Sequence, residues 1–291
     1  MTITDRDKAA LRAVAHYYTL TRQQIGALCF PEDADGRITR TRLQKLLEAG
    51  LVNRTRMEVI NPSVGAGIGA PVYYPSRKGC EFLVQETGDD SFASVPTHTP
   101  NWQHLYHWVA VAHFHILLDQ AVAREPEVTV EGWFGEWSIA NPDEELPEKR
   151  YRLYTVVQAD KPRIVAVPDA AFLLGKAGFN KVMYVEMDRD TTREASRVLA
   201  QKAPGYAGLA KIHGHLRHFP AANVEKFSVL MIAPSEKRRD ALLRAARDRD
   251  GASHWFFASL TDLTPETLLF APVFRNSVGE MKSLALRGAA S

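Results

Sequence analysis

The sequence predicts a chain of α+β architecture, in which a small, mainly helical first domain precedes an α/β domain with a mixed sheet. Four stretches with helical spacing and two strand-like stretches fill the first 85 residues, whereas strand-like and helical stretches alternate from residue 127 onward. A segment without periodicity, rich in Gly, Ser, Thr, Pro and Asp, separates the two parts. We therefore expect a first domain, a linker and a second domain at residues 1–88, 89–101 and 102–291.

The composition is that of an ordinary globular protein. Of the 291 residues, 45% are hydrophobic and 24% are charged, and no apolar run reaches the roughly 18–20 residues that span a bilayer. The first eight residues are too polar for a signal peptide. Cys29 and Cys80 have no metal-ligand spacing, which is typical of a reducing compartment. We expect a cytoplasmic protein without a membrane partner.

Three helices are predicted at the start of the chain. The first spans residues 5–18 and has Asp in its first turn. Thr21 is placed to cap the N-terminus of the second helix. The third runs from Arg37 to Gly50, where the glycine is expected to end it.

Two strand-like stretches follow the third helix, L-V-N-R-T-R at 51–56 and V-Y-Y-P at 72–75. Three helices, a strand, a loop and a strand form a winged helix-turn-helix, in which the third helix enters the major groove and the loop, here 61–71, is the wing. A fourth helix is predicted to begin near Ser76. The segments A-G-L-V and Y-P-S-R-K-G form a pair that is common in winged-helix repressors.

Basic side chains concentrate on the third helix and the strand that follows it. Residues 36–56 hold six Arg or Lys residues and one acid, Glu48, although the net charge of the whole chain is only +2. Because phosphate neutralisation supplies much of the affinity for nucleic acid, this distribution favours DNA over protein contacts, which the same fold also serves. The candidate DNA-binding residues are Arg37, Arg40, Arg42, Gln44, Lys45, Arg54 and Arg56.

Two acids lie at the ends of predicted neighbouring strands in the second domain. Asp169 opens the apolar run in V-P-D-A-A-F-L-L, and Glu186 closes the run in K-V-M-Y-V-E-M-D. Strands that end at one sheet edge would bring the two carboxylates together, where they could ligate Mg²⁺ for water activation and phosphate binding. A Pro-Asp step followed by a glutamate at the end of the next strand is typical of metal-dependent nuclease cores.

The second residue after Glu186 departs from that pattern. A nuclease core of this kind has lysine there to steady the developing charge, but this chain has Asp188. We expect Lys202, on the following helix, to be the candidate replacement. The alternative for Asp188 is structural, in which it caps the next helix together with Asp190 and pairs with Arg193.

Histidines form two groups. His104 and His107 lie three apart on a helix predicted over 102–123, and H-G-H-L-R-H occupies 213–218. Zinc ligation is the alternative, but no cysteine is nearby. We expect helix packing for the first group and contact with solvent or phosphate for the second.

The order of these parts resembles the replication-relaxation family of plasmid and mobile-element proteins. The matching stretches are R-L-Q-K-L-L-E-A-G-L-V-N-R, H-W-V-A-V, P-D-A-A-F-L-L and Y-V-E-M-D-R-D-T-T, and Lys202 and Tyr206 fit the helix that follows. The resemblance covers roughly residues 5–210. It implies a DNA-binding protein whose C-terminal domain is similar to restriction-endonuclease, PD-(D/E)xK-like folds.

The leading interpretation is a sequence-specific double-stranded DNA-binding protein with a degenerate nuclease-like domain, acting in replication, relaxation or mobilisation, or transcriptional control of a plasmid or other mobile element. A homodimer is expected, because winged-helix proteins often pair on palindromic sites. One alternative is a Mg²⁺- or Mn²⁺-dependent endonuclease or nickase that uses Asp169, Glu186 and Lys202. The other is an adaptor for replication or mobilisation proteins, suggested by the basic helix at 235–249 and the apolar stretch L-L-F-A-P-V-F.

Overall fold

A computed structural model describes residues 3–57, 69–101, 104–192 and 194–286. The chain divides into two compact units, Met1–Ile116 and Leu117–Ser291. The described residues form nine α-helices, three short 3-10 helices and a seven-stranded mixed sheet with two smaller sheets, so the predicted mixture of helices and strands is confirmed. No described helix has the length and apolar character needed to cross a bilayer.

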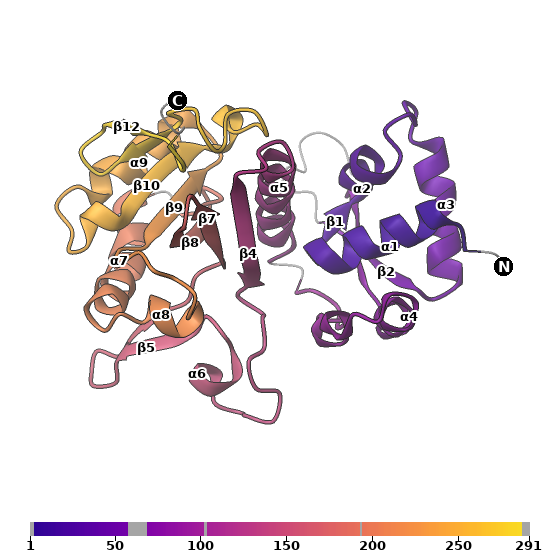
Figure 1. The fold of residues 1–291 in the computed structure, drawn as a ribbon, viewed down its shortest axis with the longest axis horizontal. Coiled ribbons are helices and arrows are strands. Elements are labelled where there is room, and N and C mark those ends of the chain that lie inside the picture. Colours follow the sequence, from indigo (N-terminus) through magenta and orange to yellow (C-terminus); the bar gives the residue numbers. More distant parts are fainter. Residues whose placement is uncertain (1–2, 58–68, 102–103, 193, 287–291) are drawn as a thin grey trace. The chain divides into compact units, whose positions relative to one another are not determined.

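The first unit combines helices with a three-stranded antiparallel sheet of order β1-β3-β2 (Figure 1). Its helices and strands, in chain order, are α1 (Asp5–Tyr17), β1 (Leu20–Thr21), α2 (Arg22–Cys29), α3 (Arg37–Glu48), β2 (Val52–Arg56), β3 (Pro71–Pro75) and α4 (Arg77–Thr87). A 3-10 helix, η2 (Asp90–Ser94), lies in the predicted linker segment, and α5 (Leu105–Val122) follows. The loop expected as a wing falls mostly on residues 58–68, outside the described residues.

Local sequence explains where these helices begin. Thr4 and Asp7 form a capping box at α1, and Thr21 and Gln24 form one at α2, as the N-cap prediction for Thr21 required. Helix α3 begins after Gly36, which has no side chain to cap it. Asp33 does so instead, because its carboxylate accepts hydrogen bonds from the Thr39 backbone N–H at 2.7 Å and from the Ile38 N–H at 3.1 Å.

The segments A-G-L-V and S-R-K-G meet at one junction. Gly50 adopts a left-handed conformation (φ +68°) after α3. The Ser76 hydroxyl donates to the Gly50 carbonyl at 2.7 Å and accepts from the Gly79 N–H at 2.9 Å, which caps α4. Gly79 packs so closely that a Cβ atom there would lie 1.9 Å from the Leu51 carbonyl oxygen. The junction therefore fixes the end of α3 against the start of α4.

Replacement of Gly79 by alanine is expected to lower the free energy of unfolding by about 1–3 kcal/mol, because the added methyl group must displace backbone. Urea denaturation measures the loss. Arg77→Ala is the matched control on the same helical turn, since the Arg77 side chain is 88% exposed. A Gly79→Ala protein as stable as the control would contradict the close packing.

The second unit is built on a sheet of order β12-β11-β10-β9-β8-β7-β4. Its strands are β4 (Val128–Gly135), β7 (Ala170–Lys176), β8 (Phe179–Met187), β9 (Ser228–Ala233), β10 (Trp255–Ser259), β11 (Phe274–Asn276) and β12 (Met281–Lys282). Strand β7 is antiparallel to β4 and β8, whereas β8, β9 and β10 are parallel. The sheet is therefore mixed, as predicted.

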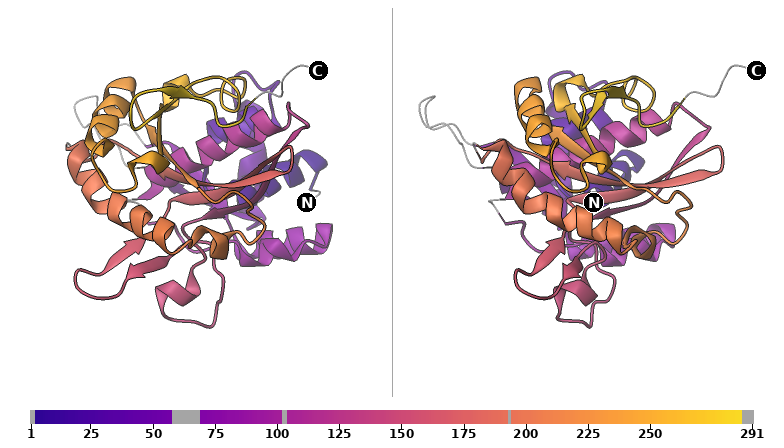
Figure 2. Two further views of the ribbon diagram at one scale, coloured as in Figure 1. Left: turned by 60° about the vertical axis from the view of Figure 1, so that its left-hand side comes forward. Right: turned by 90° about the vertical axis from the view of Figure 1, so that its left-hand side faces the viewer.

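Helices α7 (Ala195–Lys211) and α9 (Glu236–Ala246) connect the parallel strands and lie side by side along one face of the sheet (Figure 2). They bury alternate residues of the strands, among them Leu173, Tyr184, Met231 and Phe257. The remaining elements are α6 (Pro147–Arg150), β5 (Thr155–Gln158), β6 (Ile164–Ala166), α8 (His215–His218), η4 (Ala252–His254) and η5 (Leu260–Asp262). Strands β5 and β6 pair with each other, so the apolar run before Pro168 belongs to a separate two-stranded sheet.

Candidate functional site

Asp169, Glu186 and Lys202 come together on the α7 side of the sheet. Asp169 immediately precedes β7 and Glu186 is the penultimate residue of β8; the pairing of Ala170 with Val185 sets the two acids side by side. Lys202 reaches them from α7. Its ammonium group donates to Glu186 Oε2 and lies 3.6 Å from Asp169 Oδ1. One lysine therefore bridges two carboxylates whose side chains are 9% and 1% exposed.

The second carboxylate oxygen of each acid accepts a hydrogen bond from a group other than Lys202. The Met187 backbone N–H donates to Asp169 Oδ2 at 2.6 Å, and the Tyr206 hydroxyl donates to Glu186 Oε1 at 2.6 Å. Tyr206 is buried and lies one helical turn after Lys202. In the sequence, Tyr206 stood out only as part of the family resemblance, although its i, i+4 spacing from Lys202 indicates a shared helix face.

Glu136 is a third acid of this region. Its backbone N–H donates to the Asp169 carbonyl at 3.0 Å, and its charge contributes to raising the pKa of Lys202. Glu136 lies beside the cluster, one residue beyond the end of β4.

Burial dominates the electrostatics of the cluster. Loss of solvent, reinforced by the charge of Asp169, raises the pKa of Glu186 to about 8, although Lys202 and Tyr206 act in the opposite direction. Burial alone would lower the pKa of Lys202, but Asp169 and Glu186 raise it overall. Ionisation of Glu186 is therefore less favourable in the folded protein than in solution, and the Lys202 ammonium and the Tyr206 hydroxyl offset part of that cost.

Stability is expected to depend on pH through Glu186. Its folded pKa of about 8 lies above the ordinary value of 4.5, so its contribution is complete below pH 4.5 and is lost as pH rises through 8. Between pH 5 and 8.5, the unfolding free energy should fall more steeply for the natural protein than for Glu186→Gln, by on the order of a few kcal/mol. Urea denaturation across this range measures the difference. Exposed Glu225, changed to Gln, is the control, and parallel curves for all three proteins would contradict the assignment.

Asp188 belongs to a different ion pair. Its carboxylate accepts hydrogen bonds from Arg238 of α9 at 2.7 and 3.1 Å, and the two side chains are 7% and 4% exposed. Asp190 joins them at 3.1 Å from the Arg238 guanidinium. The partner considered from the sequence, Arg193, lies outside the described residues. Asp188 thus anchors α9 to the end of β8, while Lys202 pairs with Asp169 and Glu186.

The histidine expectation is wrong for His215 and His218, which are buried rather than exposed to solvent or phosphate. His218 lies 2.9 Å from the Thr155 hydroxyl and 2.7 Å from the Tyr184 hydroxyl. Burial lowers the pKa of His218 to about 3, so the ring is neutral at physiological pH. The two histidines are buried because the short helix α8 packs against the second unit's core. The spacing of residues in the sequence does not reveal this packing.

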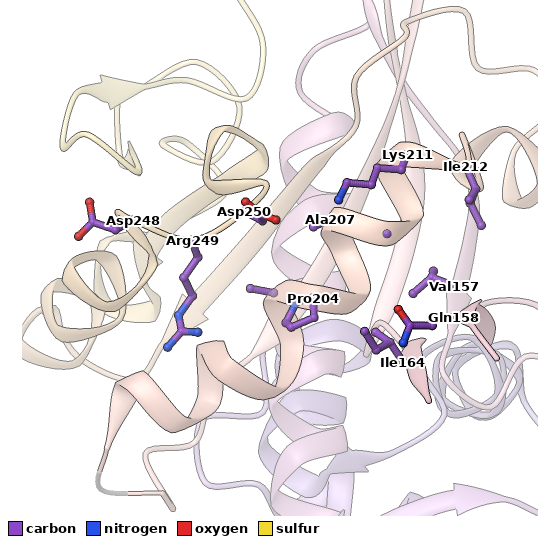
Figure 3. Close-up of a pocket in the computed structure, with 12 residues that line it drawn as sticks. Val157, Gln158, Ile164, Pro204, Ala207, Lys211, Ile212, Asp248, Arg249 and Asp250 are labelled. Atoms are coloured by element: carbon purple, nitrogen blue, oxygen red, sulfur yellow. The ribbon is translucent and has the colours of Figure 1, made fainter. Parts of the chain in front are cut away.

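A pocket of about 510 Å³ lies between the outer surface of α7, β5, β6 and residues 248–250 (Figure 3). Lys211 and Arg249 are its cations, and Asp248 and Asp250 balance them. None of the predicted site residues lines it. The pocket therefore adds no group to the acidic cluster.

The candidate DNA-binding residues divide into two sets. Thr39, Leu43 and Leu46 form the buried face of α3. The opposite surface of the helix and both arginines of β2 are exposed, which leaves six candidates accessible: Arg37, Arg40, Gln44, Lys45, Arg54 and Arg56. Arg42 differs from these, because it forms an ion pair with the buried Asp7 of α1 at 3.2 Å.

Two of the accessible candidates also have partners within the first unit. Gln44 donates to Glu48 at 3.0 Å, and the Arg56 guanidinium donates to the Gly69 carbonyl at 3.2 Å. Arg54 and Arg56, two residues apart on β2, point to the same side of the strand. The basic surface, defined here as Arg37, Arg40, Lys45, Arg54 and Arg56, thus comprises one face of α3 and one side of β2.

Comparison with known proteins places these features in context. A family model described as Replication-relaxation matches residues 11–221. No curated protein and no solved structure matches the chain. The matched region includes α3, both acids of the cluster and Lys202.

Proposed function

Because the chain belongs to the replication-relaxation family, we propose that it binds double-stranded DNA through its first unit, in the replication or relaxation of a plasmid or other mobile element. The observation that carries this proposal is the basic surface on α3 and β2. Its five cations are exposed, while the opposite face of α3 packs into the core.

The order of elements in the first unit supports a winged helix-turn-helix. Helices α2 and α3 follow one another, and β2 and β3 pair in the antiparallel sheet directly afterwards. In such a fold the helix placed as α3 enters the major groove. Helix α3 carries three of the five cations of the basic surface, which suits contact with phosphates on both sides of a groove.

Titration of fluorescent duplexes by anisotropy tests the proposal. Random-sequence 30-base-pair DNA should bind, and affinity should fall with salt with a logarithmic slope of about −4.5, since each of five phosphate contacts contributes about −0.9. Selection from a random pool should then enrich a defined sequence. The absence of duplex binding at low salt would overturn the proposal.

The two features that suggest the adaptor alternative are partly buried. The apolar stretch near the C-terminus packs into the second unit, where Leu268, Leu269 and Phe274 are at most 2% exposed. Helix α9 is basic, but its Arg238 and Arg239 are buried in ion pairs. Lys237 and Arg244 of the same helix remain exposed.

A second candidate function is metal-dependent cleavage of a DNA strand, favoured by the position of Lys202. Asp169 immediately precedes β7, Glu186 lies near the end of β8, and a lysine from α7 occupies the place that Asp188 cannot fill. This arrangement supports the expected likeness of the second unit to restriction-endonuclease folds.

The donor set fits a hard divalent cation. Asp169 Oδ1 and Glu186 Oε2 converge on the Lys202 ammonium, so two carboxylate oxygens already face one positive charge. A Mg²⁺ or Mn²⁺ ion held by these oxygens would supply water activation and neutralise a phosphate. To admit the metal ion, the Lys202 ammonium would have to move away from one of these two carboxylate oxygens. Its positive charge would still be available to the scissile phosphate.

Incubation of supercoiled plasmid with Mg²⁺ or Mn²⁺ tests this second function. Nicking that disappears in both Asp169→Asn and Glu186→Gln would support it, and no nicking with either metal would reject it. Lys202→Ala separates two roles for the lysine. Loss of nicking would show that it assists cleavage, whereas a gain in Mn²⁺ affinity without nicking would show that the ammonium replaces the metal.

A further inference from the structure

Helix α3 carries one side chain that its basic character does not explain. Ile38 is 46% exposed. Among the described residues of the first unit, it is the large apolar side chain that is exposed to solvent, whereas the others are buried or partly buried. It lies between Arg37 and Arg40, away from the buried Thr39, Leu43 and Leu46. Its branched side chain neither fills the core nor favours the helix.

Thr41 extends this apolar spot by one helical turn. It is exposed, and its hydroxyl donates to the Arg37 carbonyl at 3.0 Å. Because the hydroxyl is satisfied within the helix, the methyl group is the part of Thr41 left for outside contact. Ile38 and Thr41 line the same open hollow. Its charged lining residues are the cations Arg37, Arg42 and Lys45 and the acids Glu32, Asp33 and Asp35.

The backbone at Ile38 is held in place before any ligand arrives. Its N–H donates to Asp33, and the next residue, Thr39, is bound to the same carboxylate through both its N–H and its hydroxyl, at 2.7 Å each. Asp35 accepts from the Arg37 N–H at 2.9 Å. The first turn of α3 therefore presents Ile38 in a fixed position.

Resting on the proposed DNA binding, we propose that Ile38, flanked by the Thr41 methyl group, recognises the 5-methyl group of thymine in the major groove. Thymine is the base that displays a methyl group there, and apolar side chains are the groups that read it. Cations on either side of the spot would fix the register by binding phosphates. Ile38 would then determine sequence specificity, while the neighbouring cations would supply most of the affinity.

Replacement of thymine by uracil removes the methyl group and changes no hydrogen bond in the groove. The best duplex selected from a random pool is resynthesised with deoxyuridine at each thymidine position in turn. For the natural protein, one or two positions should weaken binding by about fourfold each, the value of one buried methyl group. Ile38→Ala should bind the thymine and uracil duplexes equally, and the thymine duplex about as weakly as the natural protein binds uracil.

Ile212→Ala is the matched control, because Ile212 is a 52% exposed isoleucine of the second unit. It should keep the full preference for thymine. Duplex binding with no loss at any uracil position, or a preference for thymine that survives in Ile38→Ala, would overturn the inference while leaving DNA binding established. If neither protein binds any duplex, the inference fails together with the proposed function, and the anisotropy titration identifies that outcome first.

Discussion

The triple variant R37E/R40E/K45E is expected to lose at least about 100-fold in affinity for duplex DNA at 0.1 M salt, because three attractive phosphate contacts become repulsive. All three side chains are exposed on α3 and contribute nothing to the buried face. The variant should therefore remain folded. Anisotropy at several salt concentrations measures the affinity, and the salt slope should become less steep by about 3.

A charge-matched control distinguishes a local site from general attraction of a cationic protein to DNA. Lys161, Lys226 and Lys237 of the second unit are also exposed, and K161E/K226E/K237E changes the net charge by the same amount. This control should change the affinity by less than about threefold. Equal losses in the two triple variants would contradict a specific role for α3.

Arg42 should behave differently from its neighbours on α3. Because it pairs with Asp7 of α1 rather than facing outward, Arg42→Glu places two acids together and is expected to affect stability more than DNA contact. The sequence grouped Arg42 with the other cations because helical spacing alone did not show which of them would meet Asp7.

Arg238→Met is expected to reduce the free energy of unfolding by about 3–5 kcal/mol, because it leaves a buried carboxylate without its partner. The Asp188 side chain is only 7% exposed, and it accepts hydrogen bonds at 2.7 and 3.1 Å from Arg238, its partner of opposite charge, besides one at 3.2 Å from the Asp190 backbone N–H. Urea denaturation measures the loss. Arg247→Met, at an exposed arginine just beyond α9, is the control.

A double-mutant cycle sharpens this test. The double variant Asp188→Asn/Arg238→Met should lose less unfolding free energy than the sum of the two single losses. Each single substitution leaves the other charge buried without its partner, and the double variant removes both charges. Single losses below about 0.5 kcal/mol would show that the pair is not important for stability. Folded Asp188→Asn should also keep any strand-nicking activity that Asp169→Asn abolishes, because Asp188 lies in the ion pair with α9.

The sequence could predict features that depend on neighbouring residues. Thr21 caps α2 because the capping signal lies within four residues, and Asp169 and Glu186 meet because both stand at ends of strands that pair directly. Lys202 could be proposed because one cation was missing beside two acids. These inferences need only local spacing and the order of strands.

Other features depend on segments far apart in the chain. Asp188 pairs with Arg238, which lies fifty residues later in the chain. Neither of the two roles considered for Asp188 from the sequence, in the acidic site or in a local helix cap, involves α9. His215 and His218 are buried by the packing of α8, although their polar neighbours indicate a surface loop. Asp33 caps α3 from outside the helix, since Gly36 occupies the position where a capping side chain is normally sought.

The two faces of α3 separate the residues that stabilise the fold from the residues that are exposed to solvent. Thr39, Leu43 and Leu46 secure the helix from beneath, and the Ser76–Gly50 junction holds its end. None of these residues belongs to the outward surface. If α3 contacts DNA as proposed, substitutions among the outward residues would change the DNA contacts at little cost in stability, so one fold could serve different DNA sites.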